Sequence, residues 1–521
     1  MRVAGGAVTT RRWLILVFAV GAALRVFPLE FGLPYLHARP DEEVATGIAV
    51  AMLGGDPNPH FFHWPSLTFY LFAGYFWLNA EVVRLLGGVP VFDAGHYVLL
   101  GRSVVAAFGA STLVLAYKIG RRVDDDVTGV LAAALLAVSI LHVRDSHFAM
   151  TDVIATMWAT GSLAQLLRAL ENRGRGEALG WFGAAGVSGG LAASTKYNAA
   201  AVVVAMGAAQ ILLLMRERRL RALLPSLVFG LLFVAGFVVA TPYAMLDFAK
   251  FKEDVIFDVT HLSGGHGINL GRGWVYHLTH TLPFGLGPTA FLAAILGIIP
   301  FVRRNAPYAF VLGSYVFVLY ITLGSGYTVF FRYILPIVPV ACVVAALGVK
   351  QVAEWLGGSA RALAVVIVLV VGPGLVNSLW FDVLLARTDT RVLAGEWLES
   401  RLQPDDTLHD AGGNYTSLDL SRAAFHQWYF DPEKNSFGDP QGRTPDWLVL
   451  YESPLFTYTR IPWQLQTLAE TRYERVHTVR ASTGRRRDAV YDLQDAFFMP
   501  VWGMWTIERP GPTVHIYRLR R

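Results

Sequence analysis

Long apolar segments recur through residues 1–385 and constrain the fold more than any other feature of the sequence. A helix needs about 20 apolar residues to span the hydrocarbon core of a membrane. The sequence therefore predicts a polytopic α-helical membrane protein. The predicted spans are 12–28, 65–86, 98–118, 127–143, 151–170, 179–195, 198–215, 222–241, 284–302, 307–323, 334–356 and 361–383.

Charged residues divide the chain into two parts. Asp, Glu, Lys and Arg make up only 16% of the residues, whereas soluble domains usually carry about 25%. The apolar segments predict a transmembrane domain, 1–385, and the remaining 386–521 have the composition of a soluble domain. Here "TRVLAGEWLESRLQPDDTLH" predicts a helix, a turn and a strand, and "DWLVLYES" and "TVHIYRL" indicate further strands. We expect an α/β domain in which "GGNYTS" forms a turn.

Clusters of Arg and Lys predict the orientation of the chain, because basic loops tend to stay in the cytoplasm. Keeping every cluster inside requires that one of the first three apolar segments does not cross. We expect 65–86, which is rich in aromatic residues, to be interfacial or re-entrant. About 11 crossings follow, with 12 or 13 as alternatives, a cytoplasmic N-terminus and an extracytoplasmic C-terminal domain. The basic clusters, which also explain the net charge of +5 without a nucleic-acid partner, are Arg2/Arg11/Arg12, Lys118/Arg121/Arg122, Arg168/Arg173/Arg175, Arg216/Arg218/Arg219/Arg221, Arg303/Arg304 and Lys350/Arg361.

Acidic residues gather on loops that this topology places outside. Asp41 and Glu42 follow Pro40 at the start of a predicted helix, and Asp152 stands where another helix begins. Acids complement the dipole at a helix start, so a structural role accounts for each of them. Two acids on different outer loops are also what acid/base or metal-assisted group transfer requires.

Two positive charges on the outer side oppose the topological bias. Lys196 in "AASTKYNAA" and Arg332 in "FFRYILPIVP" each interrupt an apolar run. Contact with lipid phosphate is one explanation. Binding of a phosphorylated ligand is the other, because Arg offers a planar fork to phosphate oxygens. Arg144 and Tyr197, in outer loops as well, are further candidate substrate-binding residues.

Histidines on the outer side raise the question of a metal ion. His63 and His261 could share a divalent cation with a carboxylate, although the sequence has no zinc signature such as HExxH. Histidines satisfied by neighbouring groups are the simpler account. Another outer segment is 243–262, and the spacing of its apolar residues predicts an amphipathic helix at the outer interface.

Six segments occur in an order that is similar to that of a known group of membrane enzymes. Their succession resembles the membrane glycosyltransferases of the GT-C fold. Within these it is most similar to glycosyltransferase family 39 and the RgtA/B/C/D-like domains, the group of protein O-mannosyltransferases and lipid A aminoarabinose transferases. The resemblance covers residues 1–385, and the segments are "RPDEEVATGIAVAMLGGD", "FFHWPSLTFYL", "GRSVVAAFGASTLVLAYKIGRR", "HFAMTDVIATMWATGSL", "GLAASTKYN" and "RYILPIVP".

The resemblance implies transfer of a sugar from a polyprenyl-phosphate carrier to a glycan, lipid or protein acceptor at the outer face of the cell membrane. It implies that Asp41 is the catalytic base, supported by Glu42, and that Asp152 is the second acid. Lys196 and Arg332 match cations that neutralise the departing phosphate.

Two departures from the group leave the acceptor open. His63 and Trp64 precede Pro65, where relatives acting on lipid A tend to have an acid and a lysine. The soluble domain that protein mannosyltransferases insert in an outer loop is missing from this sequence. A transporter of lipid-linked sugars and a non-catalytic partner subunit are the alternative functions.

Overall fold

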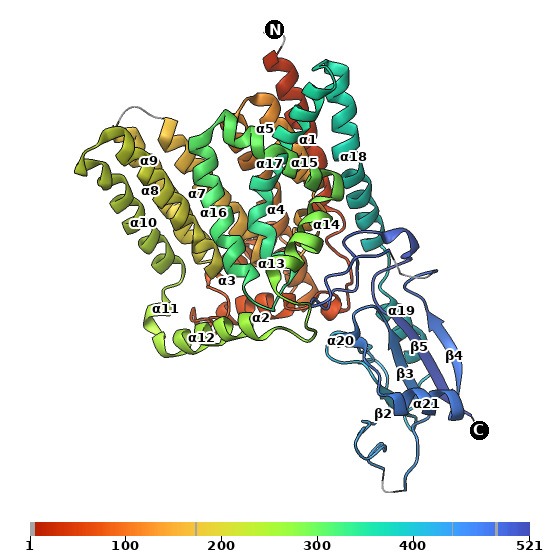
Figure 1. Ribbon diagram of the computed structural model, residues 1–521. Helices are drawn as coiled ribbons and strands as arrows, with labels where there is room; N and C mark the ends of the chain where they lie inside the picture. The colour runs from red at the N-terminus through yellow and green to blue at the C-terminus, as the bar shows by residue number, and fades with distance from the viewer. Residues whose placement is uncertain (1–5, 172–174, 440, 485–487, 521) are drawn as a thin grey trace. The chain divides into compact units, whose positions relative to one another are not determined.

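The computed structural model describes residues 6–171, 175–439, 441–484 and 488–520 (Figure 1). Two residues of the basic clusters, Arg2 and Arg173, lie outside these ranges. The chain forms two compact units. The first, which we call the membrane unit, comprises Met1–Leu29 and Val44–Leu379, and the second unit comprises Glu30–Glu43 and Trp380–Arg521.

The first part of the chain is helical, as its apolar segments predict. Short 3-10 helices lie at Tyr197–Ala201 (η2) and Phe331–Ile337 (η5). The α-helices are α1 Gly6–Val26, α2 Glu42–Met52, α3 Leu67–Leu85, α4 Ala94–Val123, α5 Asp126–Val138, α6 Ile140–Asp145, α7 Asp152–Glu171, α8 Arg175–Ala193, α9 Val202–Glu217, α10 Leu224–Ala240, α11 Tyr243–Leu246, α12 Phe248–Gly264, α13 Gly273–Tyr276, α14 Leu282–Leu286, α15 Pro288–Arg304, α16 Ala306–Gly324, α17 Val338–Trp355 and α18 Ala360–Leu385.

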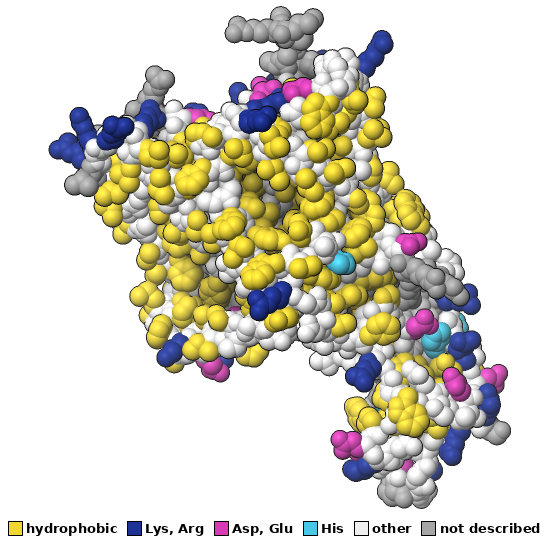
Figure 2. All heavy atoms as spheres, in the orientation of Figure 1, with side chains coloured by type: hydrophobic (Ala, Val, Ile, Leu, Met, Phe, Trp, Pro, Cys, Tyr) yellow, Lys and Arg dark blue, Asp and Glu magenta, His cyan; other side chains and the backbone are white. Residues whose placement is uncertain are grey.

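Several helical stretches are long and apolar enough to cross a membrane. Within the described ranges there are six, or seven if the bent pair Gly273–Leu286 and Pro288–Arg304 is one span. Figure 2 shows hydrophobic side chains covering the face of the helices that it displays. The chain is a multi-pass membrane protein, as predicted, and the larger total of 11–13 crossings stays a prediction. The six stretches are Ala94–Val123, Tyr197–Glu217, Arg221–Ala240, Ala306–Gly324, Phe331–Trp355 and Ala360–Glu399.

Two segments depart from a simple bundle of spanning helices. Residues 67–85 form the single unbroken helix α3, so the chain does not turn back within them, and their interfacial placement stays a prediction. The predicted amphipathic helix is present as α11 and α12, which are separated at Asp247. Figure 1 shows α12 lying across the ends of the neighbouring helices. Its Phe257 and Val259 are exposed while Asp254 is buried, which suits a helix that faces lipid on one side.

The second unit is an α/β domain, as the sequence predicts. Its sheet has the strand order β2-β1-β3-β5-β4. Strand β1 is parallel to β2 and β3, whereas β5 is antiparallel to β3 and β4. Ala394 and Leu398 pack in one core cluster with Val449 and Ile516 of the sheet. The elements are α19 Thr390–Glu399, β1 Thr407–Asp410, β2 His426–Gln427, β3 Trp447–Glu452, α20 Phe456–Thr459, α21 Trp463–Arg472, β4 Tyr473–Val479 and β5 Thr513–Leu519.

Candidate functional site

A buried ion pair joins two of the residues singled out in the sequence. Asp152 begins α7, and its carboxylate is buried. The ammonium group of Lys196, which precedes η2, binds Asp152 Oδ1 and lies 5.0 Å from the ring centre of Tyr333 in η5. A buried carboxylate needs such a partner, since an unpaired charge is strongly destabilising. Three segments distant in sequence therefore meet at one charge pair.

Arg332 lies on the same short 3-10 helix as Tyr333. Its guanidinium group stands 4.4 Å from the ring centre of Phe330. Cations over aromatic rings are held by the ring quadrupole without losing their charge. The structure thus places the second predicted cation next in sequence to the aromatic residue that Lys196 contacts. Sequence reasoning missed Tyr333, because an aromatic residue inside an apolar run carries no signal of its own.

The segment before α3 is fixed against the loop that carries Lys196. The Tyr197 hydroxyl donates to the carbonyl oxygen of Phe62 at 2.8 Å, and the Leu67 amide donates to the Ser194 carbonyl oxygen at 3.0 Å. The Phe62 amide in turn donates to Asp254 Oδ2 of α12 at 2.7 Å. Tyr197, predicted as a substrate-binding residue, therefore links its own loop to the segment before α3 by a hydrogen bond.

Charged side chains on one face of α12 complete this region. His63 Nδ1 lies 3.0 Å from Asp258 Oδ1, and its Nε2 lies 3.6 Å from Asp254 Oδ1. Burial raises the pKa of Asp258 above its ordinary value, in spite of His63 beside it. Burial acts the same way on Asp254, but hydrogen bonds from Lys250 and the Phe62 amide bring its pKa below the ordinary value. The i, i+4 spacing of residues 250, 254 and 258 was the available signal for this cluster.

The two histidines considered as metal ligands have other partners in the structure. His63 is paired with the two aspartates of α12, and the ring of His261 stacks on Phe257 with centroids 6.0 Å apart. Among the described residues no group of three or more His, Cys, Asp or Glu has an arrangement that could hold a metal ion. Within the described residues these contacts agree with histidines satisfied by neighbouring groups, and a cation shared by His63 or His261 stays a prediction.

Three further residues predicted for the site are Asp41, Glu42 and Arg144. Asp41 immediately precedes α2 with a φ angle of 72°, and Glu42, the first residue of α2, is buried. Both belong to the second unit, so a pocket shared by Asp41 and Asp152 stays a prediction. Arg144 is buried in α6, where its guanidinium group lies 5.6 Å from the ring centre of Phe148, and its role at the site also stays a prediction.

Comparison with known sequences gives two similarities. Residues 94–243 match the family described as dolichyl-phosphate-mannose-protein mannosyltransferase. The chain is also 32% identical over 305 residues to the undecaprenyl phosphate-α-4-amino-4-deoxy-L-arabinose arabinosyl transferase of Pseudomonas aeruginosa (strain LESB58). That match covers 54% of this chain and 51% of the relative, so the chain spans about half the length of the curated relative that it matches.

Comparison with solved structures extends over nearly the whole chain. ArnT from Cupriavidus metallidurans in the apo state superposes with a TM-score of 0.54 at 15% identity, covering 98% of both chains. The oligosaccharyltransferase of Archaeoglobus fulgidus, in a complex with Zn and sulfate, gives a TM-score of 0.56 at 11% identity, over 97% of this chain and 88% of that one. The chain therefore has the GT-C fold, and the expected resemblance to the family 39 group of membrane glycosyltransferases is confirmed.

Proposed function

We propose that the protein is an enzyme that transfers a sugar from a polyprenyl-phosphate carrier to a hydroxyl or phosphate group of an acceptor. The observation that carries this proposal is the buried Asp152–Lys196 pair beside η5, in a chain with the GT-C fold. The similar arabinosyl transferase is named for an undecaprenyl-phosphate donor, and ArnT has been solved with undecaprenyl phosphate bound. Transfer takes place at the outer face of the cell membrane, with the N-terminus in the cytoplasm and the second unit outside.

Lys196 and Arg332 are the groups that receive the donor phosphate. The ammonium group has three N–H donors, of which Asp152 needs one, and the Lys196 side chain retains 17% of its exposure. The phosphate gains negative charge as its bond to the sugar breaks. Fixed cations aimed at that charge stabilise the transition state more than the ground state. Arg144 and Tyr197 contribute to donor binding.

Asp41 is the catalytic base. Its carboxylate accepts the proton of the acceptor hydroxyl while the hydroxyl oxygen bonds to the anomeric carbon. The bond from that carbon to the phosphate oxygen breaks, and polyprenyl phosphate leaves with the electron pair. Glu42 supports the charge of its neighbour. The left-handed backbone of Asp41 favours this role, because such conformations are uncommon outside glycine and concentrate at functional sites.

Transfer by the full chain in lipid nanodiscs tests the proposal. Radiolabelled undecaprenyl-phosphate sugars, including mannose and aminoarabinose, are supplied with a cell-envelope extract, and labelled product and released lipid phosphate are measured. Asp41→Asn should lower the rate by about 10²-fold or more, since a positioned base contributes about 10²–10⁴. The variant should fold normally because Asn tolerates a positive φ.

Glu253→Gln is the matched control, because Glu253 is an exposed acid of α12. It should transfer at the wild-type rate. Equal rates for Asp41→Asn and wild type would remove Asp41 from its role. If labelled donor crosses the bilayer of proteoliposomes unchanged and no product forms, the protein is a transporter and the proposed transfer reaction is wrong.

A further inference from the structure

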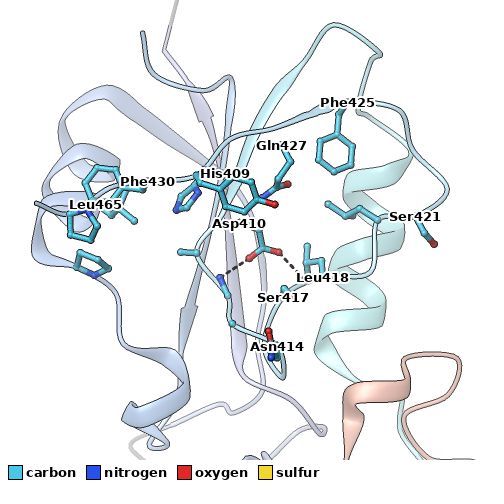
Figure 3. A pocket seen from close by; sticks show the side chains of 17 residues that line it. His409, Asp410, Asn414, Ser417, Leu418, Ser421, Phe425, Gln427, Phe430 and Leu465 are labelled. Atoms are coloured by element: carbon cyan, nitrogen blue, oxygen red, sulfur yellow. Dashed lines mark hydrogen bonds between the residues drawn. The ribbon is translucent and has the colours of Figure 1, made fainter. Parts of the chain in front are cut away.

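The second unit contains a cavity that is lined by none of the residues proposed for the transfer reaction. It has a volume of about 800 Å³ and lies beside the carboxyl ends of the parallel strands β1 and β2 (Figure 3). Its walls come from the end of β1, the loop 411–421, the segment 425–432 and the start of α21. Crevices at the carboxyl ends of parallel strands are where α/β sheets commonly bind ligands. The cavity lies wholly within the second unit.

The floor of this cavity is held in shape by Asp410. Its carboxylate accepts hydrogen bonds from the Gly412 amide at 2.8 Å, the Leu418 amide at 2.9 Å and the Tyr451 hydroxyl at 2.9 Å. The dashed lines in Figure 3 show the first two. A Cβ atom on Gly412 would stand 2.5 Å from the Ser417 amide nitrogen, so the turn closes too tightly for any other residue. The turn is therefore held in place by these hydrogen bonds and by its close packing.

The lining disfavours an anionic ligand. Among the described residues that line the cavity, none is Lys or Arg, the side chains that normally hold phosphate or carboxylate groups. Burial lowers the pKa of His409, whose Nδ1 lies 2.9 Å from the Trp428 carbonyl oxygen, so the imidazole is neutral near pH 7. Asp410, already engaged with three donors, would repel an anion.

Aromatic rings and neutral polar groups make up the rest of the lining. Phe425 and Phe430 stand on opposite sides of the cavity with Gln427 between them (Figure 3). Tyr429 also lines the cavity and is 75% exposed. The side-chain amides of Asn414 and Gln427 are exposed, and each offers two donors and an acceptor to a ligand.

We propose that this cavity binds a neutral glycan. The apolar C–H faces of sugar rings pack on aromatic side chains, and sugar hydroxyls exchange hydrogen bonds with carboxamides and serine hydroxyls. A rigid cavity needs little ordering on binding, which favours a weak polar ligand of this kind. The assignment stands on the lining of the cavity and does not require that the protein transfers a sugar.

Binding by the full chain in nanodiscs tests the assignment. An array of neutral oligosaccharides, with glycans bearing uronic acid or phosphate and with AMP as anionic probes, selects a ligand for calorimetry. Tyr429→Ala and Gln427→Ala should each weaken binding of the selected neutral glycan by fivefold or more. Phe456→Ala is the matched control, since Phe456 is 72% exposed in the same unit and does not line the cavity, and it should bind as wild type does.

Three results would overturn the assignment. The first is that no neutral glycan binds, or that only the anionic probes do. The second is that both cavity variants bind the neutral glycan as tightly as wild type. The third is that Phe456→Ala weakens binding as much as Tyr429→Ala does. None of these measurements involves a polyprenyl-phosphate donor, so they are independent of the transfer assay.

Discussion

Two carboxylates, one in each unit, are enclosed by the protein in different ways. Asp152 of the membrane unit is balanced by a full positive charge on Lys196. Asp410 of the second unit is surrounded by neutral donors, two backbone amides and a phenol. A charge pair is responsive to a charged ligand, because a phosphate competes with the carboxylate for the cation. A ring of neutral donors has no such competitor and fixes backbone instead. The comparison separates a group suited to chemistry from a group suited to architecture.

Breaking the charge pair should have the largest effect. Asp152→Asn and Lys196→Met each leave a buried charge without its partner, which typically costs about 3–5 kcal/mol of unfolding free energy. The double variant should recover most of this stability, since two neutral groups replace two charges. Transfer should stay lost in all three. Unfolding in micelles and the nanodisc assay give the two readouts, and a double variant that regains transfer would make the pair purely structural.

Removing the Asp410 carboxylate, which accepts the hydrogen bonds of the neutral donors, should have a smaller effect. Asp410→Ala leaves the amides of Gly412 and Leu418 without their acceptor, and unsatisfied buried groups cost about 1–3 kcal/mol. Limited proteolysis should cut the loop 411–421 faster, and glycan binding should weaken with it. Unchanged cleavage of the loop 411–421 in this variant would show that Asp410 does not hold the loop in place.

The pH dependence of Asp410 should be the smallest of the three effects. Burial raises the pKa of Asp410 above the ordinary value of 3.8, although its three hydrogen bonds act the other way. The folded state therefore binds the proton more tightly than the unfolded state does. Its stabilising contribution is complete below about pH 4 and is lost as the pH rises through the folded pKa. Asp410→Asn cannot titrate, so the difference in melting temperature between wild type and variant should favour wild type more at pH 4 than at pH 7.

The sequence singles out the two members of the charge pair, but it predicts neither their pairing nor their surroundings. Lys196 and Asp152 stand out because charges that interrupt apolar runs are rare and expensive in a membrane. Tyr333 does not stand out, since aromatic residues are common in such runs. Asp254 and Asp258 do not stand out either, because the amphipathic pattern of their helix explains polar residues without assigning them partners. Each of these contacts depends on the packing of segments far apart in the chain.

The second unit shows the same limit, because the sequence predicts its local elements but not the cavity that they form. Its helix–turn–strand start and its strands at "DWLVLYES" and "TVHIYRL" follow from local patterns, and the structure confirms them. The "GGNYTS" turn is also where the sequence predicts it. Its role as the wall of a cavity is not visible in the sequence, because the facing side chains come from 425–432 and from α21. The order of strands across the sheet brings them together.

The backbone at position 41 has a consequence for directed evolution. With φ at 72°, this position accepts Gly, Asn and Asp with little strain and penalises side chains branched at Cβ. Of the three tolerated residues only Asp carries a charge. On the proposed role of Asp41, a saturation library screened once for expression and once for sugar transfer would sort its members along two separate axes, with Gly and Asn retained by the first screen and discarded by the second.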